Sequence, residues 1–282
     1  MRIAFFGTGL MGTGFVRGLL ARKHDVTIWN RTAAKAKALE AEGAHVAADP
    51  AAAVRGVERV YLSLSDDRSV DDTLAAALPA LAREAPIVDF TTTAPFPTRA
   101  RGERLAAEGR PFFHAPVFMM PEHARKSEGM MLGAGSAEVH ALVEKELQAM
   151  TGSFVYLGPD LLRAAAFKLF GNSMSFAVVS GLADVFNLAR VVGIEPAEAV
   201  GFLAKLNPGR QIELRGTKMA RGDFAATFEL SMARKDVRLA IETAAEGGRR
   251  LAVLPAIAAR MDELIAGGRG GDDLGVLGAE SH

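Results

Sequence analysis

Residues 3–12 read IAFFGTGLMG, an apolar run that leads directly into three spaced glycines. Aromatic and β-branched residues in a short run are typical of a buried strand. Residues 11–22 follow with apolar Phe15, Leu19 and Leu20 on one helical face. We therefore expect a strand, a glycine turn and a helix in that order.

The glycines match the pattern G-x-G-x-x-G. In this context the first glycine allows a tight turn, the second lets the backbone approach a pyrophosphate, and the third allows the helix to pack closely on the strand. The helix N-terminus then faces the anion. A glycine turn without a ligand is the alternative. The motif assigns to a dinucleotide cofactor Gly7, Thr8, Gly9, Leu10, Met11 and Gly12.

The alternation of strand and helix continues along the first half of the chain. Strands are expected at 26–29, 59–64 and 87–90, with helices at 33–42 and 69–78 between them. Such alternation predicts an α/β fold with a doubly wound parallel sheet of the Rossmann type. Two further runs, 112–118 and 130–132, are expected to extend the same sheet before a helix at 137–150.

The character of the chain changes after residue 160. Residues 161–192 lack proline and carry helix formers throughout, which predicts one unusually long helix, and the remainder also has helical patterns. We therefore expect a cofactor-binding Rossmann domain over 1–160 and an all-helical substrate and dimerisation domain over 161–282.

The composition limits the possible partners and compartments. Basic and acidic residues balance at 33 each, so there is no basic excess for nucleic acid or a membrane surface. Cysteine is absent, which fits a reducing compartment. No run is expected to reach the ~18 apolar residues that span a bilayer, because charged residues or glycines interrupt each candidate. The expectation is a soluble, cytoplasmic protein.

The end of the second expected strand indicates which dinucleotide is bound. An acidic residue there would accept hydrogen bonds from the ribose 2′-hydroxyl of NAD, but the chain has Asn30-Arg31-Thr32. Arg31 offers a planar fork for phosphate oxygens, and its neighbours add neutral hydrogen-bonding groups. NADP is therefore the predicted cofactor. Alternatively, Arg31 is a solvated charge and Thr32 a helix N-cap.

Several motifs, in order, resemble the β-hydroxyacid dehydrogenase family, which includes 3-hydroxyisobutyrate dehydrogenase and tartronate semialdehyde reductase. The resemblance covers nearly the whole length and rests on the glycine motif and on Asp89-Phe90-Thr91-Thr92-Thr93-Ala94-Pro95, Ala115-Pro116-Val117, Lys168-Leu169-Phe170-Gly171-Asn172 and Lys235-Asp236.

The resemblance implies roles for four residues. Lys168 would donate a proton to the carbonyl oxygen during reduction and accept it during oxidation, and Asn172 would orient the reacting groups. Thr92 would lie near the nicotinamide ribose, and Lys235 would reach the cofactor from the last domain. A homodimer that packs through the long helix is also implied. The alternatives are a strand-end cap for Thr92 and a surface ion pair for Lys235.

The residues themselves support Lys168. A spacing of four places Lys168 and Asn172 on one helix face. The apolar neighbours Phe167 and Leu169, together with the positive charge of a nicotinamide, would disfavour the ammonium form and lower the pKa. The alternative is a lysine on a core helix whose ammonium reaches solvent.

The substrate segment departs from the family pattern. Members of the family usually carry Ser-Gly-Gly where this chain has Phe118, Met119 and Met120, so a carboxylate cradle would be replaced by an apolar wall. Arg125, Lys126 or Arg163 would be substitute anion ligands, although solvated charges are the simpler interpretation. His114 is either a polar pocket group or a strand histidine whose hydrogen bonds are satisfied.

The sequence thus predicts an NADP-dependent oxidoreductase that interconverts a small hydroxy acid and its aldehyde or keto form. Phe118 to Glu122 and Val26 to Thr32 also resemble imine reductases, which makes NADPH-dependent imine reduction the second hypothesis. The third is an NADP-binding interaction module without catalysis. The substrate assignments are Phe118, Met119, Met120, Lys168 and Asn172, and no metal site is predicted.

Overall fold

A computed structural model of the protein describes residues 1–279. The chain forms two compact units, Met1–Asn172 and Ser173–His282. The division falls inside the long helix, twelve residues beyond the expected boundary at 160. Each unit is a folded body of its own, with the α/β elements in the first and only helices and turns in the described part of the second.

The first unit is built on a parallel sheet of six strands in the order β3-β2-β1-β4-β5-β6. The central strand is fully buried from Ile3 to Phe6, as expected when helices cover both faces of a parallel sheet. The expected doubly wound topology is confirmed. The strands are β1 (Arg2–Phe6), β2 (Asp25–Trp29), β3 (His45–Val46), β4 (Arg59–Leu62), β5 (Ile87–Asp89) and β6 (Phe112–His114).

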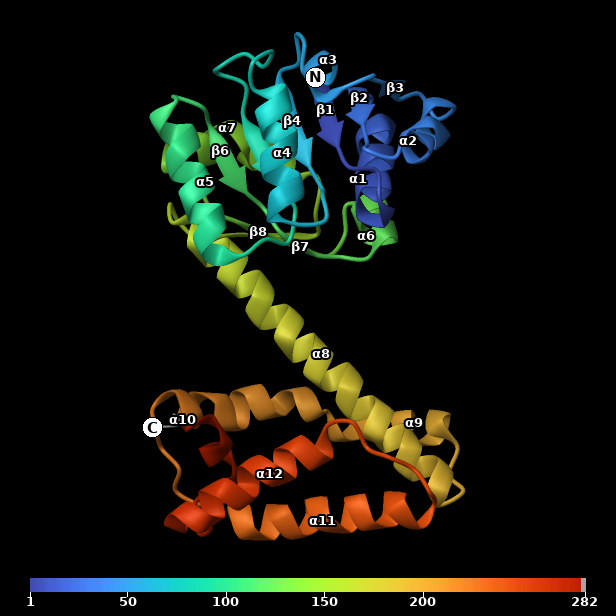
Figure 1. Ribbon diagram of the computed structural model, residues 1–282, viewed down its shortest axis with the longest axis vertical. Helices are drawn as coiled ribbons and strands as arrows, with labels where there is room; N and C mark the ends of the chain where they lie inside the picture. Colours follow the sequence, from blue (N-terminus) through green and yellow to red (C-terminus); the bar gives the residue numbers. More distant parts are fainter. Residues whose placement is uncertain (280–282) are drawn as a thin grey trace. The chain divides into compact units, whose positions relative to one another are not determined.

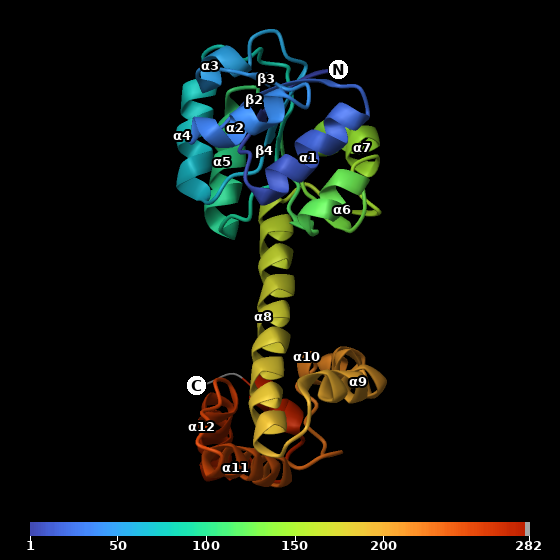
Figure 2. The same ribbon diagram turned by 90° about the vertical axis from the view of Figure 1, so that its right-hand side faces the viewer.

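Helices cover the two faces of this sheet (Figures 1 and 2). One apolar core contains residues of α1 (Leu10–Ala21) and α7 (Ala137–Gln148), and the other contains residues of α4 (Asp67–Ala77) and α5 (Pro95–Ala107). Figure 2 shows α4 and α5 on one side of the strands and α1 and α7 on the other. The remaining helices of the α/β region are α2 (Ala33–Glu40), α3 (Pro50–Ala53) and α6 (Pro121–Lys126).

The expected strand at 112–118 is wrong as a single element. It breaks after His114, and the chain continues as β7 (Val117–Phe118) in a separate sheet of order β7-β8-β9. Pro116 has no N–H to donate to a sheet, so the ladder is interrupted there. The run at 130–132 therefore does not extend the main sheet. It is β8 (Met130–Gly133), which pairs with β7 and with β9 (Ser153–Tyr156), a strand that the sequence analysis missed.

The expected long helix is confirmed as α8 (Leu161–Val191), with 31 residues. By length and composition it is apolar enough to cross a membrane, with a mean hydropathy of 1.3 over 18 residues, which corrects the expectation that no segment qualifies. The mean hydropathy of such a window stays high even when one or two charged residues interrupt the apolar run. A single such helix is weak evidence for a membrane protein, and 6% of this window is buried within the structure.

The second unit consists of the later part of α8 with α9 (Pro196–Leu206), α10 (Thr217–Ala220), α11 (Leu230–Glu246) and α12 (Leu254–Leu264). Short 3-10 or π turns lie at 208–210, 212–216, 265–269 and 274–278. Leu230 and Met261 are buried in a core that joins α11 to α12.

Asp184 of α8 joins that helix to the start of α12. Its carboxylate accepts hydrogen bonds from the backbone N–H groups of Ala252, Val253 and Leu254 at 2.5, 2.9 and 3.0 Å. Burial raises the pKa of Asp184, but the three backbone bonds outweigh burial and hold the pKa below its ordinary value.

Replacing this carboxylate should destabilise the second unit. In Asp184→Ala three backbone donors lose their acceptor, so we expect the free energy of unfolding to fall by about 3 kcal/mol at neutral pH. Because the folded pKa is depressed, the contribution of Asp184 is present above the unfolded pKa of about 3.9 and is lost as the pH falls through the folded value. Urea unfolding measures both effects, with the exposed Glu263→Ala as the matched control. Equal stability of Asp184→Ala and wild type at pH 7 would contradict this role.

Candidate active site

The glycine motif forms the turn between β1 and α1. Gly7 has φ +94°, a conformation that favours glycine, and its N–H donates to the carbonyl of Trp29 at 3.0 Å. A Cβ on Gly7 would overlap the carbonyl of Ser63, and one on Gly12 would overlap the carbonyl of Gly7. At Gly9 a Cβ would meet nothing within 4 Å, so space remains open beside the backbone there. The turn thus has the shape that a pyrophosphate requires.

A groove of about 740 Å³ runs along this turn. It brings together most of the residues that the sequence assigned to the cofactor, and it also contains Lys168. Among its described lining residues, three are cationic and one, Asp72, is acidic. Of the predicted set, the groove is lined by Gly7, Gly9, Leu10, Met11, Gly12, Asn30, Arg31, Thr32, Thr92, Met119 and Lys168.

The end of β2 presents cationic and neutral groups to the groove. Thr32 occupies the N-cap position of α2, although its side chain makes no capping hydrogen bond, and Arg31 is exposed, as the alternative of a solvated charge beside a helix N-cap expects. The Asn30 amide is used within the chain: its Oδ1 accepts from the Thr8 N–H at 3.0 Å, and its Nδ2 donates to the Thr32 carbonyl at 2.9 Å. Asn30 therefore ties the glycine turn to β2, while binding of the phosphate by Arg31 and Thr32 stays a prediction.

Lys35 is a groove residue that the sequence analysis missed. It lies in the first turn of α2, whereas Arg31 lies two residues before that helix begins, and both cations line the groove. The short distance in sequence from Arg31 is the signal that could have identified it. With no acidic residue at the end of β2 and two cations beside the groove, the residues present fit a dinucleotide that carries a 2′-phosphate.

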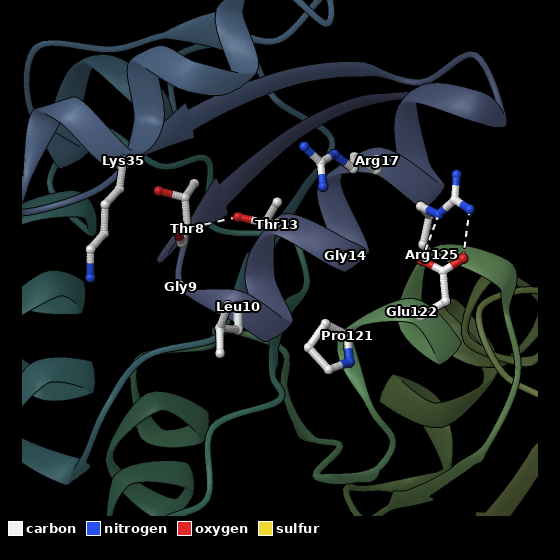
Figure 3. A pocket seen from close by; sticks show the side chains of 10 residues that line it. All are labelled: Thr8, Gly9, Leu10, Thr13, Gly14, Arg17, Lys35, Pro121, Glu122 and Arg125. Carbon is white, nitrogen blue, oxygen red and sulfur yellow. Dashed lines mark hydrogen bonds and ion pairs between the residues drawn. The ribbon is translucent and has the colours of Figure 1, made fainter.

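A second cavity of about 400 Å³ lies against the glycine turn, α1 and α6 (Figure 3). Thr8 lines this cavity rather than the groove, and its carbonyl accepts a hydrogen bond from the Thr13 hydroxyl. Both guanidinium groups at its edge are already paired with carboxylates: Arg17 with Glu42, and Arg125 with Glu122. Lys35 lines both this cavity and the groove.

Hydrogen bonds hold the loops that follow β4 and β5, which line the same groove as the glycine turn. The Thr91 N–H donates to Asp89 at 2.9 Å, and the Thr91 hydroxyl accepts from the Leu64 N–H at 2.9 Å. Thr92 is exposed to the groove. His114 does not line it: the ring is fully buried, with Nδ1 3.7 Å from the Asp89 carboxylate. His114 is thus a buried strand histidine rather than a pocket group, but neither ring nitrogen has a hydrogen-bond partner among the described residues, so the expectation of satisfied hydrogen bonds is wrong.

Lys168 projects from α8 into the groove and is only 9% exposed. Its ammonium donates to the Val117 carbonyl at 2.6 Å and lies 4.2 Å from the centre of the Phe118 ring. Burial lowers the pKa of Lys168 from its ordinary value of 10.5, as the apolar neighbours suggested. Asn172, one turn later, is half-buried and is not among the groove's described lining residues. Its assignment as the partner of Lys168 stays a prediction.

The substrate segment presents apolar groups. Met119 lines the groove, Phe118 packs against α8, and Met120 is 59% exposed. The cations considered as anion ligands are engaged elsewhere. Arg125 and Lys126 pair with Glu122, the latter at 3.4 Å, and Arg163 lies over the Phe167 ring.

Lys235 lies in the second unit, near the start of α11. Its side chain is half-exposed, and its ammonium is 3.2 Å from the carboxylate of Asp236. This is the surface ion pair considered as its alternative role, and its contact with the cofactor stays a prediction.

Two family models match the chain. Residues 2–158 match the NAD binding domain of 6-phosphogluconate dehydrogenase. Residues 163–277 match the model described as NAD-binding of NADP-dependent 3-hydroxyisobutyrate dehydrogenase.

Curated relatives and solved structures agree with these matches. The chain is 28% identical over 247 residues to the cytokine-like nuclear factor N-PAC of Xenopus tropicalis, covering 85% of this chain but only 46% of that protein. It is 27% identical to the uncharacterized oxidoreductase YfjR of Bacillus subtilis, covering 86% and 87% of the two chains. A reductive aminase from Aspergillus terreus, solved with NADPH and ethyl levulinate, is 28% identical with a TM-score of 0.88, covering 98% and 97%.

Arg31 and Lys35 should distinguish NADP from NAD. We expect Arg31→Ala and Lys35→Ala each to weaken NADP⁺ binding about ten-fold, because each removes a charge-assisted bond to the 2′-phosphate, and to leave NAD⁺ binding nearly unchanged. Calorimetric titration of both dinucleotides measures this. Lys37→Ala on the same helix is the matched control, since Lys37 is exposed and lies outside the groove lining. Equal losses for both dinucleotides would show that these cations bind no 2′-phosphate.

Proposed function

Because the chain belongs to the β-hydroxyacid dehydrogenase family of NAD(P)-dependent oxidoreductases, we propose that it is an NADPH-dependent reductase of a carbonyl group in which Lys168 is the proton donor. The observation that carries the proposal is the placement of one buried ammonium in the same groove as the glycine turn. A reduction of this kind needs a hydride and a proton at neighbouring atoms of the substrate.

NADP is the cofactor that the groove fits. Gly7 shapes the turn, Gly9 leaves room for the pyrophosphate to approach the backbone, and Arg31, Thr32 and Lys35 would hold the 2′-phosphate. When bound, NADPH supplies the hydride. The structural relatives at 28% identity that were solved with NADPH support this choice over NADH.

Lys168 would transfer a proton from Nζ to the substrate oxygen, and the resulting neutral amine would regain a proton from water. Burial disfavours the ammonium, so Lys168 gives up its proton more readily than a surface lysine. The Val117 carbonyl, which accepts one N–H of the ammonium, holds the donor at the groove wall.

The substrate proposed here is an aldehyde or ketone with apolar substituents. Met119 and the neighbouring Phe118 offer an apolar surface, and the nearby cations Arg125 and Lys126 are paired with Glu122. A small semialdehyde acid, the substrate class expected from the family resemblance, would have to place its carboxylate near Lys168 itself. Such an acid therefore serves as the first comparison substrate.

Imine reduction is the second candidate. It is favoured by the Aspergillus terreus reductive aminase solved with cyclohexanone and allyl amine, which is 27% identical and covers 98% of this chain. Against it stands the ammonium of Lys168, because a cation beside an iminium carbon adds like-charge repulsion. Carbonyl reduction remains the first proposal for that reason.

A substrate panel separates the candidates. Purified protein is given NADPH with neutral ketones and aldehydes, semialdehyde acids, or cyclic imines, and NADPH absorbance is followed, with NADH in parallel. Turnover of neutral carbonyl compounds is the expected result. Turnover of cyclic imines alone would replace the first proposal with the second. Binding of NADPH without turnover of any class would point to a non-catalytic module and overturn both.

Removing the ammonium should abolish turnover without affecting the cofactor. We expect Lys168→Met to lower kcat by at least about 10²-fold with unchanged NADPH affinity, since general acid catalysis contributes that much. In wild type, reduction requires the protonated form, so kcat should fall as the pH rises through a pKa below 10.5. Lys145→Met, which removes an exposed lysine of α7, is the control. Near-normal turnover in Lys168→Met would refute the assignment.

We also propose a homodimer that covers the exposed apolar side chains of the second unit. On α8 these are Met174, Phe176, Val178 and Val179, between 51% and 67% exposed, and on α9 Phe202 and Leu206 are 65% and 59% exposed. A soluble monomer rarely exposes so many large apolar groups on two consecutive helices. A second copy of the chain is the partner that the family resemblance implies.

The oligomeric state tests this surface. Light scattering should show a dimer for wild type and a monomer for Phe176→Glu, because a charge in an apolar interface costs several kcal/mol. Leu142→Glu makes the same change at an exposed leucine of α7, 54% exposed, and should leave the dimer intact. A monomeric wild type, or a dimeric Phe176→Glu, would contradict the proposal.

A further inference from the structure

The ammonium of Lys168 has an aromatic ring as its neighbour in place of a carboxylate. Its Nζ lies 4.2 Å from the centre of the Phe118 ring, within the range in which a ring face attracts a cation. Burial is the one cause that shifts its pKa, so no charged group among the described residues compensates for the loss of water. The ring and the Val117 carbonyl are the groups that replace solvent around this cation.

The backbone and the core fix the position of the ring. Phe118 belongs to β7, where it pairs with Met130 of β8, and its side chain packs into the small core that contains Leu132 and Ala164. Ala164, Lys168 and Gly171 have helical spacings of four and three, so they share one face of α8. Phe118 therefore contacts the same helix face from which Lys168 projects.

Gly171 leaves the space that the ring tip occupies. A Cβ at Gly171 would overlap Cζ of Phe118 and come within 2.6 Å of its Cε1. Any other residue at 171 would push the ring out of its position over Lys168. The contact thus depends on two residues that the sequence places 53 positions apart.

We infer that Phe118, seated over Gly171, is the positioning residue that holds the Lys168 ammonium against the Val117 carbonyl at the wall of the groove. An ammonium has three N–H groups, and one is donated to Val117. The Phe118 ring restrains the Lys168 side chain so that the other two N–H groups stay at the groove wall. The link between this positioning and proton transfer rests on the proposed function. The restraint on Lys168 can be measured whether or not that function is correct.

Chemical labelling measures the restraint directly. Trace acetylation of the whole protein, with the Lys168 peptide quantified by mass spectrometry, reports how accessible and how deprotonated the amine is. We expect the labelling rate of Lys168 to rise about ten-fold in Phe118→Leu, which keeps an apolar side chain but removes the ring face. Gly171→Ala should produce a similar rise because it displaces the ring.

Gly181→Ala is the matched control for the glycine variant. It makes the same change in the same helix, at a position where a Cβ meets nothing within 4 Å, and should label at the wild-type rate. Wild-type labelling rates in both Phe118→Leu and Gly171→Ala would overturn the positioning role. A rise in Gly181→Ala equal to that in Gly171→Ala would do so too, since the effect would then come from the helix and not from the ring.

The kinetic test separates this inference from the proposed function. In Phe118→Leu we expect kcat to fall about ten-fold with an unchanged dissociation constant for NADPH. We also expect the pH at which kcat falls to differ from that of wild type. If wild type reduces no substrate while the labelling rates change as expected, the proposed function fails and the positioning role stands. If kcat falls but labelling does not change, the positioning role is wrong and Phe118 acts on the substrate.

Discussion

The structure of the first unit depends on the hydrogen-bonded position of β1 between β2 and β4. This strand pairs in parallel on both sides, and its side chains from Ile3 to Phe6 are fully buried. Parallel pairing requires crossover connections, and because all the strands run in the same direction their carboxyl ends lie at one edge of the sheet. The glycine turn, the end of β2 and the loops after β4 and β5 meet at that edge for this reason, and together they make the groove.

The edge of the sheet supplies backbone groups, neutral groups and Arg31, whereas the proposed proton donor comes from α8. Lys168 enters from α8 and loses most of its hydration in doing so. A buried ammonium is costly unless polar or aromatic groups replace water. Here the Val117 carbonyl and the Phe118 ring replace water around the ammonium. A neighbouring carboxylate would raise the pKa of Lys168, and with none beside it among the described residues the pKa stays lowered by burial.

The substrate segment shows how the same fold acquires a different surface. The chain turns out of the main sheet at Pro116 and forms the short strand β7, so that Val117, Phe118 and Met119 all approach the lysine or the groove. Ser-Gly-Gly at this place would leave room and N–H groups for an anion. Phe118 and Met119 fill that room, which is the reason for the proposed preference for apolar substituents.

The sequence by itself determined the elements whose signals are local. The apolar run and glycine spacing of residues 3–12, the missing acid after β2 and the long uninterrupted helix from Leu161 each depend on neighbours within one or two turns, so they could be predicted. Tertiary structure decided what depends on distant residues. The break at Pro116 that creates a second sheet, the internal use of the Asn30 amide and the position of the Phe118 ring over Lys168 and Gly171 follow from contacts between segments far apart in the chain. No residue pattern encodes which strand edge or side chain will be available when such segments meet, because packing selects among partners of similar local preference.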